Sequence, residues 1–253
     1  MNQWPLIIRD LNVWTEGRQR LDHVNLQAEC CRVLSIIGPM GSGKSTLVRC
    51  INRLYDEVPG SRIEGIIEIN GKNIYDPNFD LFQLRRDVAM TFAEPRPFKH
   101  MSIFENVAIG LRLQGMRAGA VIGERVEEAL ALVGLWDFVR KKLHKSTESL
   151  RPGQQQLLCI ARSLALKPEI LLLDEPTSMV GLQDSAIIEQ LIRELSQKLT
   201  IVLTTNSRKQ AARISDRTAF LLDGELIEVG KTSELFMNPK DSRTEDYLTG
   251  RFG

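Results

Sequence analysis

The sequence predicts an α/β fold that carries an antiparallel β subdomain and a helical insert. Short apolar runs typical of buried strands alternate with helical patterns near both ends of the chain. Partly alternating runs, typical of antiparallel strands, lie near the N-terminus, and helical patterns cluster between about residues 94 and 165. A chain of 253 residues suits one large α/β domain or two small ones. We expect a single domain over residues 1–253, with the insert inside it.

The N-terminal third is predicted to hold most of the β subdomain. "PLIIRDLNVW" and "RLDHVNLQA" show the partial alternation of antiparallel strands near a sheet edge. "RVLSII" is nearly all apolar, as expected of a strand that is covered on both faces, and the helical "STLVRCINRL" follows it. "GIIEINGKNI" places Asn70-Gly71 between two β-rich runs, which predicts a hairpin.

The middle of the chain is predicted to be helical. In "SIFENVAIGLRL", Ser102 and Glu105 have the spacing of a capping box before an amphipathic helix. "GERVEEALALVGL" has apolar positions at helical spacing. A third helix is expected to start at Pro152, because proline suits the first turn, and to continue through "GQQQLLCIARSLAL".

The C-terminal third returns to alternating strands and helices. "EILLLDEP" and "TIVLTT" read as buried strands, and "GLQDSAIIEQLIRELSQ" between them reads as a helix. "TAFLLDGELIEVG" predicts a second hairpin across Asp223-Gly224.

The composition excludes several classes of protein. The net charge of +1 gives no electrostatic reason to expect a nucleic-acid partner. The four cysteines lack Cys-x-x-Cys spacing, so we expect reduced, buried thiols and neither a disulfide framework nor a zinc site. The opening "MNQWPLIIRD" does not resemble a signal peptide, and no run approaches the ~18 apolar residues that span a bilayer. Any membrane role is therefore expected to come from a partner.

"GPMGSGKST" is the motif that predicts the chemistry. It fits G-x-x-x-x-G-K-[ST] and lies between a predicted strand and a predicted helix. Its glycines let the backbone wrap a phosphate chain, and the helix adds its N-terminal dipole. Lys44 can reach the β- and γ-phosphates, and the Ser45 hydroxyl can ligate Mg²⁺. The expected nucleotide-binding residues are Gly38, Pro39, Met40, Gly41, Ser42, Gly43, Lys44, Ser45 and Thr46.

The Asp-Glu pair in "LLLDEP" supplies the matching acids. Asp174, at the end of a buried strand, can hold the metal ion through water, together with Ser45. Glu175 can orient or deprotonate an attacking water. With ATP and Mg²⁺ as the expected ligands, Glu175 is the candidate catalytic residue.

Over almost its whole length the chain resembles the ATP-binding subunits of ABC transporters, and within them the phosphate-import branch. The resemblance rests on the motifs above, on "PRPFKHMSIFENVAIGLRL" and "LCIARSLALKPEILLLDEP", and on "AARISDRTAFLLDGELIE" and "TEDYLTGRFG". It implies a P-loop ABC ATP-binding fold at the cytoplasmic face of a membrane. It also implies two membrane-spanning permease subunits, a second ATP-binding subunit (an identical chain or a paralogue) and, indirectly, a solute-binding protein.

The chain departs from that family at five positions. The Q-loop glutamine falls at Ala93, the signature serine and first glycine fall at Arg151 and Pro152, the D-loop aspartate falls at Gly181, and the switch histidine falls at Asn206. Each position contacts the γ-phosphate or couples the subunits in the family that the chain resembles. The place of the adenine-stacking tyrosine offers Trp14, which can stack on the base or belong to the core.

These departures leave two hypotheses for activity. In the first, the chain couples ATP binding and hydrolysis to import. In the second, it binds ATP and turns it over poorly, as a regulatory or structural subunit. Each lost donor could lower turnover on the order of 10²–10³-fold, whereas Lys44, Ser45 and Asp174 remain for binding. A soluble ATPase of DNA repair or translation is disfavoured, because the chain has neither a second nucleotide domain nor a long coiled-coil insert.

Overall fold

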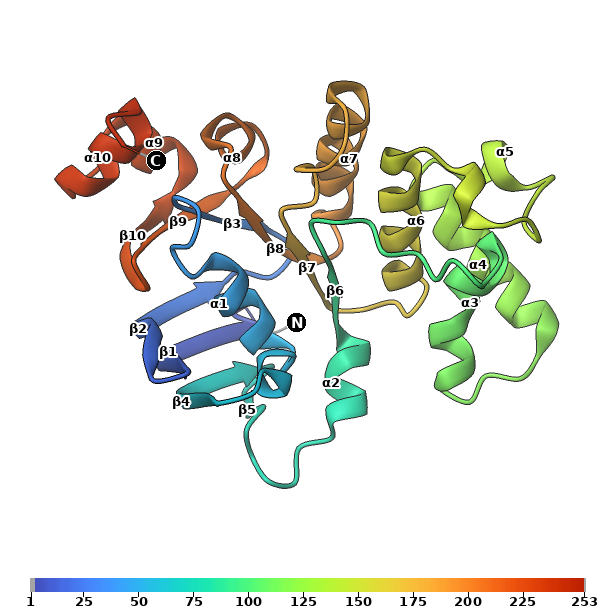
Figure 1. The fold of residues 1–253 in the computed structure, drawn as a ribbon, viewed down its shortest axis with the longest axis horizontal. Coiled ribbons are helices and arrows are strands. Elements are labelled where there is room, and N and C mark those ends of the chain that lie inside the picture. The colour runs from blue at the N-terminus through green and yellow to red at the C-terminus, as the bar shows by residue number, and fades with distance from the viewer. Residues whose placement is uncertain (1–2, 253) are drawn as a thin grey trace.

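The computed structural model describes residues 3–252, and in them ten strands form one twisted sheet. The order of the strands is β5-β4-β1-β2-β10-β9-β3-β8-β7-β6. Figure 1 shows an antiparallel part of the sheet and a bundle of helices at opposite ends of the molecule, with the parallel strands between them.

The antiparallel part follows the sequence prediction closely. Strands β1 (Leu6–Thr15) and β2 (Arg18–Ala28) pair antiparallel. Strands β4 (Ser61–Ile69) and β5 (Lys72–Asn73) form the hairpin across Asn70-Gly71. Because β4 pairs with β1, this hairpin lies outside β1, and β5 is the edge strand of the sheet.

Parallel strands form the other half of the sheet and extend to its second edge, at β6. They are β3 (Val33–Ile37), β6 (Val88–Thr91), β7 (Ile170–Asp174) and β8 (Thr200–Thr205). Every residue of β3, β7 and β8 is buried, which explains their apolar runs. Strand β9 (Arg217–Leu222) pairs parallel with β3 and forms the second predicted hairpin with β10 (Glu225–Lys231).

Several helices pack against the sheet. Beside the sheet lie α1 (Lys44–Ile51), α2 (Leu81–Asp87), α7 (Leu182–Leu195), α8 (Arg208–Ile214), α9 (Thr232–Met237) and α10 (Ser242–Thr249). Single 3-10 turns cover Tyr55–Glu57 and Thr147–Ser149. Across residues 3–252, every helix is too short or too polar to span a bilayer.

The helices between β6 and β7 make up the insert seen at one end of Figure 1. They are α3 (Ile103–Leu113), α4 (Gly119–Leu132), α5 (Trp136–Val139) and α6 (Pro152–Leu164). Helix α3 has the predicted capping box, in which Ser102 and Glu105 each bond the other's backbone N–H, and α6 begins at Pro152 as predicted. Helix α4 begins at Gly119, four residues before the predicted start, and its first turn places Ile122 in the core, one helical turn before Val126.

The interior joins the insert to the sheet. Alternate residues of a strand point to opposite faces, so Leu171 and Leu173 pack with the insert and α7, whereas Ile170 and Leu172 pack with α1 and the antiparallel strands. A smaller cluster around Phe220 and Tyr247 holds α10 against β9. The two faces of one central sheet thus support two different sets of elements.

Candidate functional site

The glycine-rich loop, residues 38–46, runs from the end of β3 into α1. Gly43 precedes the helix with φ of 102°, a left-handed conformation that favours glycine. A Cβ atom on Gly38 would lie 2.1 Å from the carbonyl oxygen of Leu221 on β9. The loop therefore needs glycine at both positions, and it directs the free N–H groups of the first turn of α1 toward its concave side.

Lys44 is the buried cation of this loop. Its Nζ donates to the carbonyl oxygens of Gly38 at 2.9 Å and Pro39 at 2.8 Å. Burial lowers the pKa of Lys44, and the negative charges of Glu175 and Asp174 partly oppose that shift. The ammonium group is held by neutral carbonyls, so an anion bound in the loop would relieve the cost of burying its charge.

Asp174 is the buried carboxylate that faces the loop. The Ser45 Oγ and the Thr204 Oγ1 both donate to its Oδ1 at 2.8 Å. Thr204 reaches it because β7 and β8 pair in the register Asp174↔Thr204. The Arg49 guanidinium lies 3.5 Å from the other oxygen, Oδ2. The predicted metal residues, Ser45 and Asp174, are therefore in direct contact.

The donors at this point suit a magnesium ion. A hydroxyl and a carboxylate are hard oxygen ligands, and Mg²⁺ in phosphate sites uses one or two carboxylates together with substrate phosphates and water. Residues 3–252 hold no group of three or more His, Cys, Asp or Glu side chains that could bind a metal by themselves. Ser45 and Asp174 thus fit an ion that arrives with a phosphate ligand.

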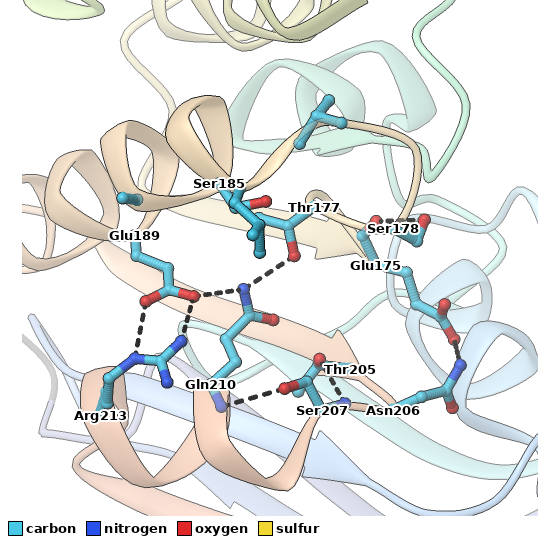
Figure 2. A pocket seen from close by; sticks show the side chains of 13 residues that line it. Glu175, Thr177, Ser178, Ser185, Glu189, Thr205, Asn206, Ser207, Gln210 and Arg213 are labelled. Atoms are coloured by element: carbon cyan, nitrogen blue, oxygen red, sulfur yellow. Dashed lines mark hydrogen bonds and ion pairs between the residues drawn. The ribbon is translucent and has the colours of Figure 1, made fainter.

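Glu175 lies directly after β7 in a strained backbone. Its φ of 48° is left-handed, and its backbone N–H donates to the Oγ1 of Thr204 at 3.0 Å. The Asn206 side chain, from the loop after β8, donates to the Glu175 Oε1 at 2.7 Å, as Figure 2 shows. The position aligned with the switch histidine therefore supplies a hydrogen bond to the candidate base.

Two pockets meet at Glu175. The first has a volume of about 660 Å³. It is lined by Gln19, Arg20, Met40, Gly41, Gly43, Lys44, Ser45, Thr46, Arg49, Tyr55, Val58, Glu175, Asp223 and Gly224. The second, of about 510 Å³, lies between α7 and α8 and is drawn in Figure 2. Glu175 is thus placed where the loop pocket meets the surface of α7 and α8.

The second pocket is organised by a network of polar contacts around Glu189 and Gln210. The Glu189 carboxylate accepts from Arg213 at 2.7 Å and from Gln210 at 3.2 Å, and Gln210 also donates to Thr177 at 2.8 Å. These bonds tie α8 to α7 and to the segment after Glu175. Because Asn206 precedes α8, they help to fix the loop that holds Glu175.

Trp14 lies outside this arrangement. It is half-buried on β1, beside Arg62 of β4, whose guanidinium carbon lies 4.8 Å from the centre of the indole ring. Among the described residues, the lining of the loop pocket includes Tyr55 but not Trp14. The Tyr55 hydroxyl shares a hydrogen bond of 2.6 Å with the Thr15 Oγ1.

The other departing positions also lie away from the loop pocket of their own chain. Ala93 follows β6 in a bend, next to Phe92, whose carbonyl accepts from Gln156 of α6 at 2.9 Å. Arg151 and Pro152 are exposed at the start of α6, where the Gln154 side chain accepts from the Arg151 N–H at 3.1 Å. Gly181 is exposed and precedes α7. A single chain therefore does not bring these positions to its own loop.

Sequence reasoning missed Arg49, Thr204 and Tyr55. Arg49 carried a usable signal, because it follows Ser45 by four residues on one helix and so shares its face. Thr204 and Tyr55 are brought to the site only by the register between strands and by the reversal of the chain, which no local sequence pattern indicates.

The loop, the facing carboxylate and the strand order together define a P-loop nucleotide-binding protein. The sequence model of the ABC transporter family matches residues 21–178. A solved dimeric ATP-binding cassette, in a post-hydrolysis state with ADP and Pi, superposes with a TM-score of 0.77 at 29% identity, over 90% of this chain and 98% of that one. The chain belongs to the ABC transporter family, and its fold is that of the ATP-binding cassette.

Curated relatives within the family match the full chain. The phosphate import ATP-binding protein PstB of Pseudoalteromonas translucida is 49% identical over 99% of this chain and 91% of its own length. The phosphate import ATP-binding protein PstB 1 of Streptococcus agalactiae serotype III is 47% identical over the whole of both chains. These similarities agree with the resemblance to the phosphate-import branch.

Proposed function

We propose that this chain is the ATP-binding subunit of a phosphate importer and couples ATP binding and hydrolysis to transport. The observation that carries the proposal is the contact between Ser45 and Asp174 under a loop that buries Lys44. The full-length similarity to phosphate import ATP-binding proteins supports the cargo. In this assignment residues 1–253 act as one ATP-binding domain, with a helical subdomain at about 94–165.

In this proposal each part of the site has one task. The loop N–H groups and Lys44 bind the phosphate chain, and Ser45 and Asp174 hold Mg²⁺, which supplies charge neutralisation to the phosphates. Glu175 orients and accepts a proton from the attacking water, and Asn206 fixes its carboxylate. Trp14 remains a candidate for contact with the base.

The partners follow from the same assignment. We propose that the chain docks on the cytoplasmic side of two membrane-spanning permease subunits and pairs with a second ATP-binding subunit. The dimeric state of the similar cassette with ADP and Pi supports the pairing. A solute-binding protein would act through the permease rather than on this chain.

A second function, ATP binding with little turnover, is favoured by Arg151 and Pro152. Pro152 has no N–H to donate, and the Arg151 side chain is exposed at the start of α6, where the family has a serine. The contact between Asn206 and Glu175 favours retained hydrolysis instead, since it keeps the candidate base in place.

The experiment compares Mg-ATP turnover and nucleotide binding for the purified chain and its Glu175→Gln variant. We expect the variant to bind ATP normally and to lose turnover by roughly 10²–10⁴-fold. Glu194→Gln, on the exposed side of α7, is the matched control and should retain full turnover. Binding without turnover in the unmodified chain would select the second function, and unchanged turnover in Glu175→Gln would overturn the assignment of the base.

A further inference from the structure

Cys30 and Cys31 present two thiols on the same side of the turn between β2 and β3. Side chains of neighbouring residues in an extended chain point in opposite directions. Here Cys31 has φ of 56°, a left-handed conformation, and the two Sγ atoms lie 3.3 Å apart. That separation is well beyond the ~2.05 Å of a disulfide bond. The pair is therefore a preformed dithiol.

The turn is fixed from two directions. The Cys30 N–H donates to the carbonyl oxygen of Gln3 at 3.0 Å, and the Cys31 N–H donates to the Thr200 Oγ1 at 3.1 Å. Both bonds use the backbone of the cysteines. The side chains are thus positioned by main-chain contacts that a Cys→Ser change would leave intact.

The pair opens into a pocket of about 430 Å³ at this end of the sheet. The pocket is lined by Pro5, Cys30, Cys31, Asn70, Pro168, Glu169, Lys198 and Thr200. Both cysteines are partly exposed, unlike Cys50 and Cys159, which are buried as the sequence predicts. The expectation of buried thiols is therefore wrong for Cys30 and Cys31, because their turn lies at the surface.

The number and type of side chains around the two cysteines determine which kind of atom the pair can bind. The pair lacks a third cysteine, histidine or carboxylate positioned to complete a metal site among residues 3–252, whereas zinc sites use three or four protein ligands. Two adjacent thiols suit a soft, trigonal centre that forms two bonds to sulfur. Trivalent arsenic is such a centre, and it carries its third substituent with it.

We propose that Cys30 and Cys31 form a dithiol binding site for trivalent arsenic compounds. With arsenite, As(OH)₃, two As–O bonds break and two As–S bonds form, and each thiol proton leaves with a hydroxide as water. An organic arsenical oxide, R–As=O, reacts with both thiols to give R–As(S–Cys)₂ and one water. Arsenic stays trivalent in both reactions, so no oxidant or reductant is required, and the pocket accommodates the group R.

The site is separate from the glycine-rich loop. The cysteines precede the first residue of β3 and the loop follows its last, so the five-residue strand places roughly 16 Å between them at ~3.3 Å per residue. ATP binding is therefore a measure of folding in the variants and does not depend on the dithiol.

The test is titration of the reduced full-length chain with phenylarsine oxide, followed by intact-mass spectrometry and calorimetry. We expect one phenylarsenic group per chain, retained against a monothiol and removed by dithiothreitol. Because the second As–S bond forms intramolecularly, Cys30→Ser and Cys31→Ser should each weaken binding by roughly 10²-fold or more. Cys159→Ser, which removes a buried thiol of α6, is the matched control and should bind like the unmodified chain.

Two results would overturn the proposal. One is binding of the arsenical by Cys30→Ser or Cys31→Ser with unchanged affinity while ATP binding shows that the variant is folded. The other is loss of binding in a folded Cys159→Ser variant.

Discussion

The Asn206 side chain donates a hydrogen bond of 2.7 Å to the carboxylate of Glu175. The two residues follow neighbouring parallel strands, β7 and β8, which end side by side. Asn206 aligns with the histidine of the family and lacks a titratable ring, yet it makes a contact that orients Glu175. At the position of that histidine, Asn206 thus supplies a side-chain N–H to Glu175.

We expect Asn206→Ala to lower turnover without changing the affinity for ATP. A hydrogen bond to a charged group contributes about 1.5–3 kcal/mol, which corresponds to roughly 10–10²-fold in rate when it acts on the catalytic step. Asn206→His restores an N–H donor and should retain turnover near that of the unmodified chain. Steady-state kinetics with both variants measure the effect, and an unchanged kcat in Asn206→Ala would show that the contact does not matter.

Lys44 should destabilise the nucleotide-free protein and be required for stabilisation by ATP. The pKa of Lys44 is lowered in the folded protein, so between that pKa and the ordinary lysine value of 10.5 the unfolded chain binds more protons than the folded one. Stability of the nucleotide-free protein therefore rises with pH across that window, and this contribution should be absent from Lys44→Met.

Chemical denaturation of the two proteins from neutral to alkaline pH checks this. Lys44→Met should be the more stable protein at neutral pH, and the difference should shrink as pH rises. At an ATP concentration 100 times the Kd, the unmodified chain should gain about 2.7 kcal/mol and Lys44→Met almost nothing. A larger stability difference at high pH would contradict the assigned direction of the pKa shift.

Gly153→Ala should destabilise the start of α6. A Cβ atom there would lie 2.2 Å from the carboxyl carbon of Asp184, which is at the start of α7. Overpacking of this kind costs about 1–3 kcal/mol. Gly123→Ala, in α4, is the matched control, because no atom lies within 4 Å of the added Cβ, and it should stabilise by about 1 kcal/mol. Urea midpoints that move in the same direction for both variants would refute this reading.

Tyr247 should hold α10 against the core and the glycine-rich loop. Its ring stacks on Phe220 with centroids 4.8 Å apart; burial raises the pKa of its hydroxyl, and the nearby backbone of Gly38 partly opposes that shift. Tyr247→Ala should lower the free energy of unfolding by about 3–5 kcal/mol. Tyr247→Phe keeps the ring and should cost only about 0.5–1.5 kcal/mol. Equal losses in the two variants would show that the hydroxyl, and not the stacked ring, carries the contribution.

Much of the fold was predictable because its signals are local. The Asn-Gly and Asp-Gly dipeptides define their hairpins by backbone preference alone. The capping box at Ser102 and the proline at 152 each mark the start of a helix, and each signal is contained in no more than four consecutive residues. The short helix α5 was not predicted, because four residues cannot show a helical period.

The sequence by itself determined the glycine-rich loop, the Asp174-Glu175 pair and the departures from the family pattern. It did so because a phosphate loop is built from consecutive backbone groups and needs no distant contact to be recognised. Only the tertiary structure decided that Asn206 meets Glu175, that Thr204 donates to Asp174, and that Trp14 lies against Arg62. Those pairings depend on the register between strands and on the path of the chain between them, which residue type and spacing do not specify.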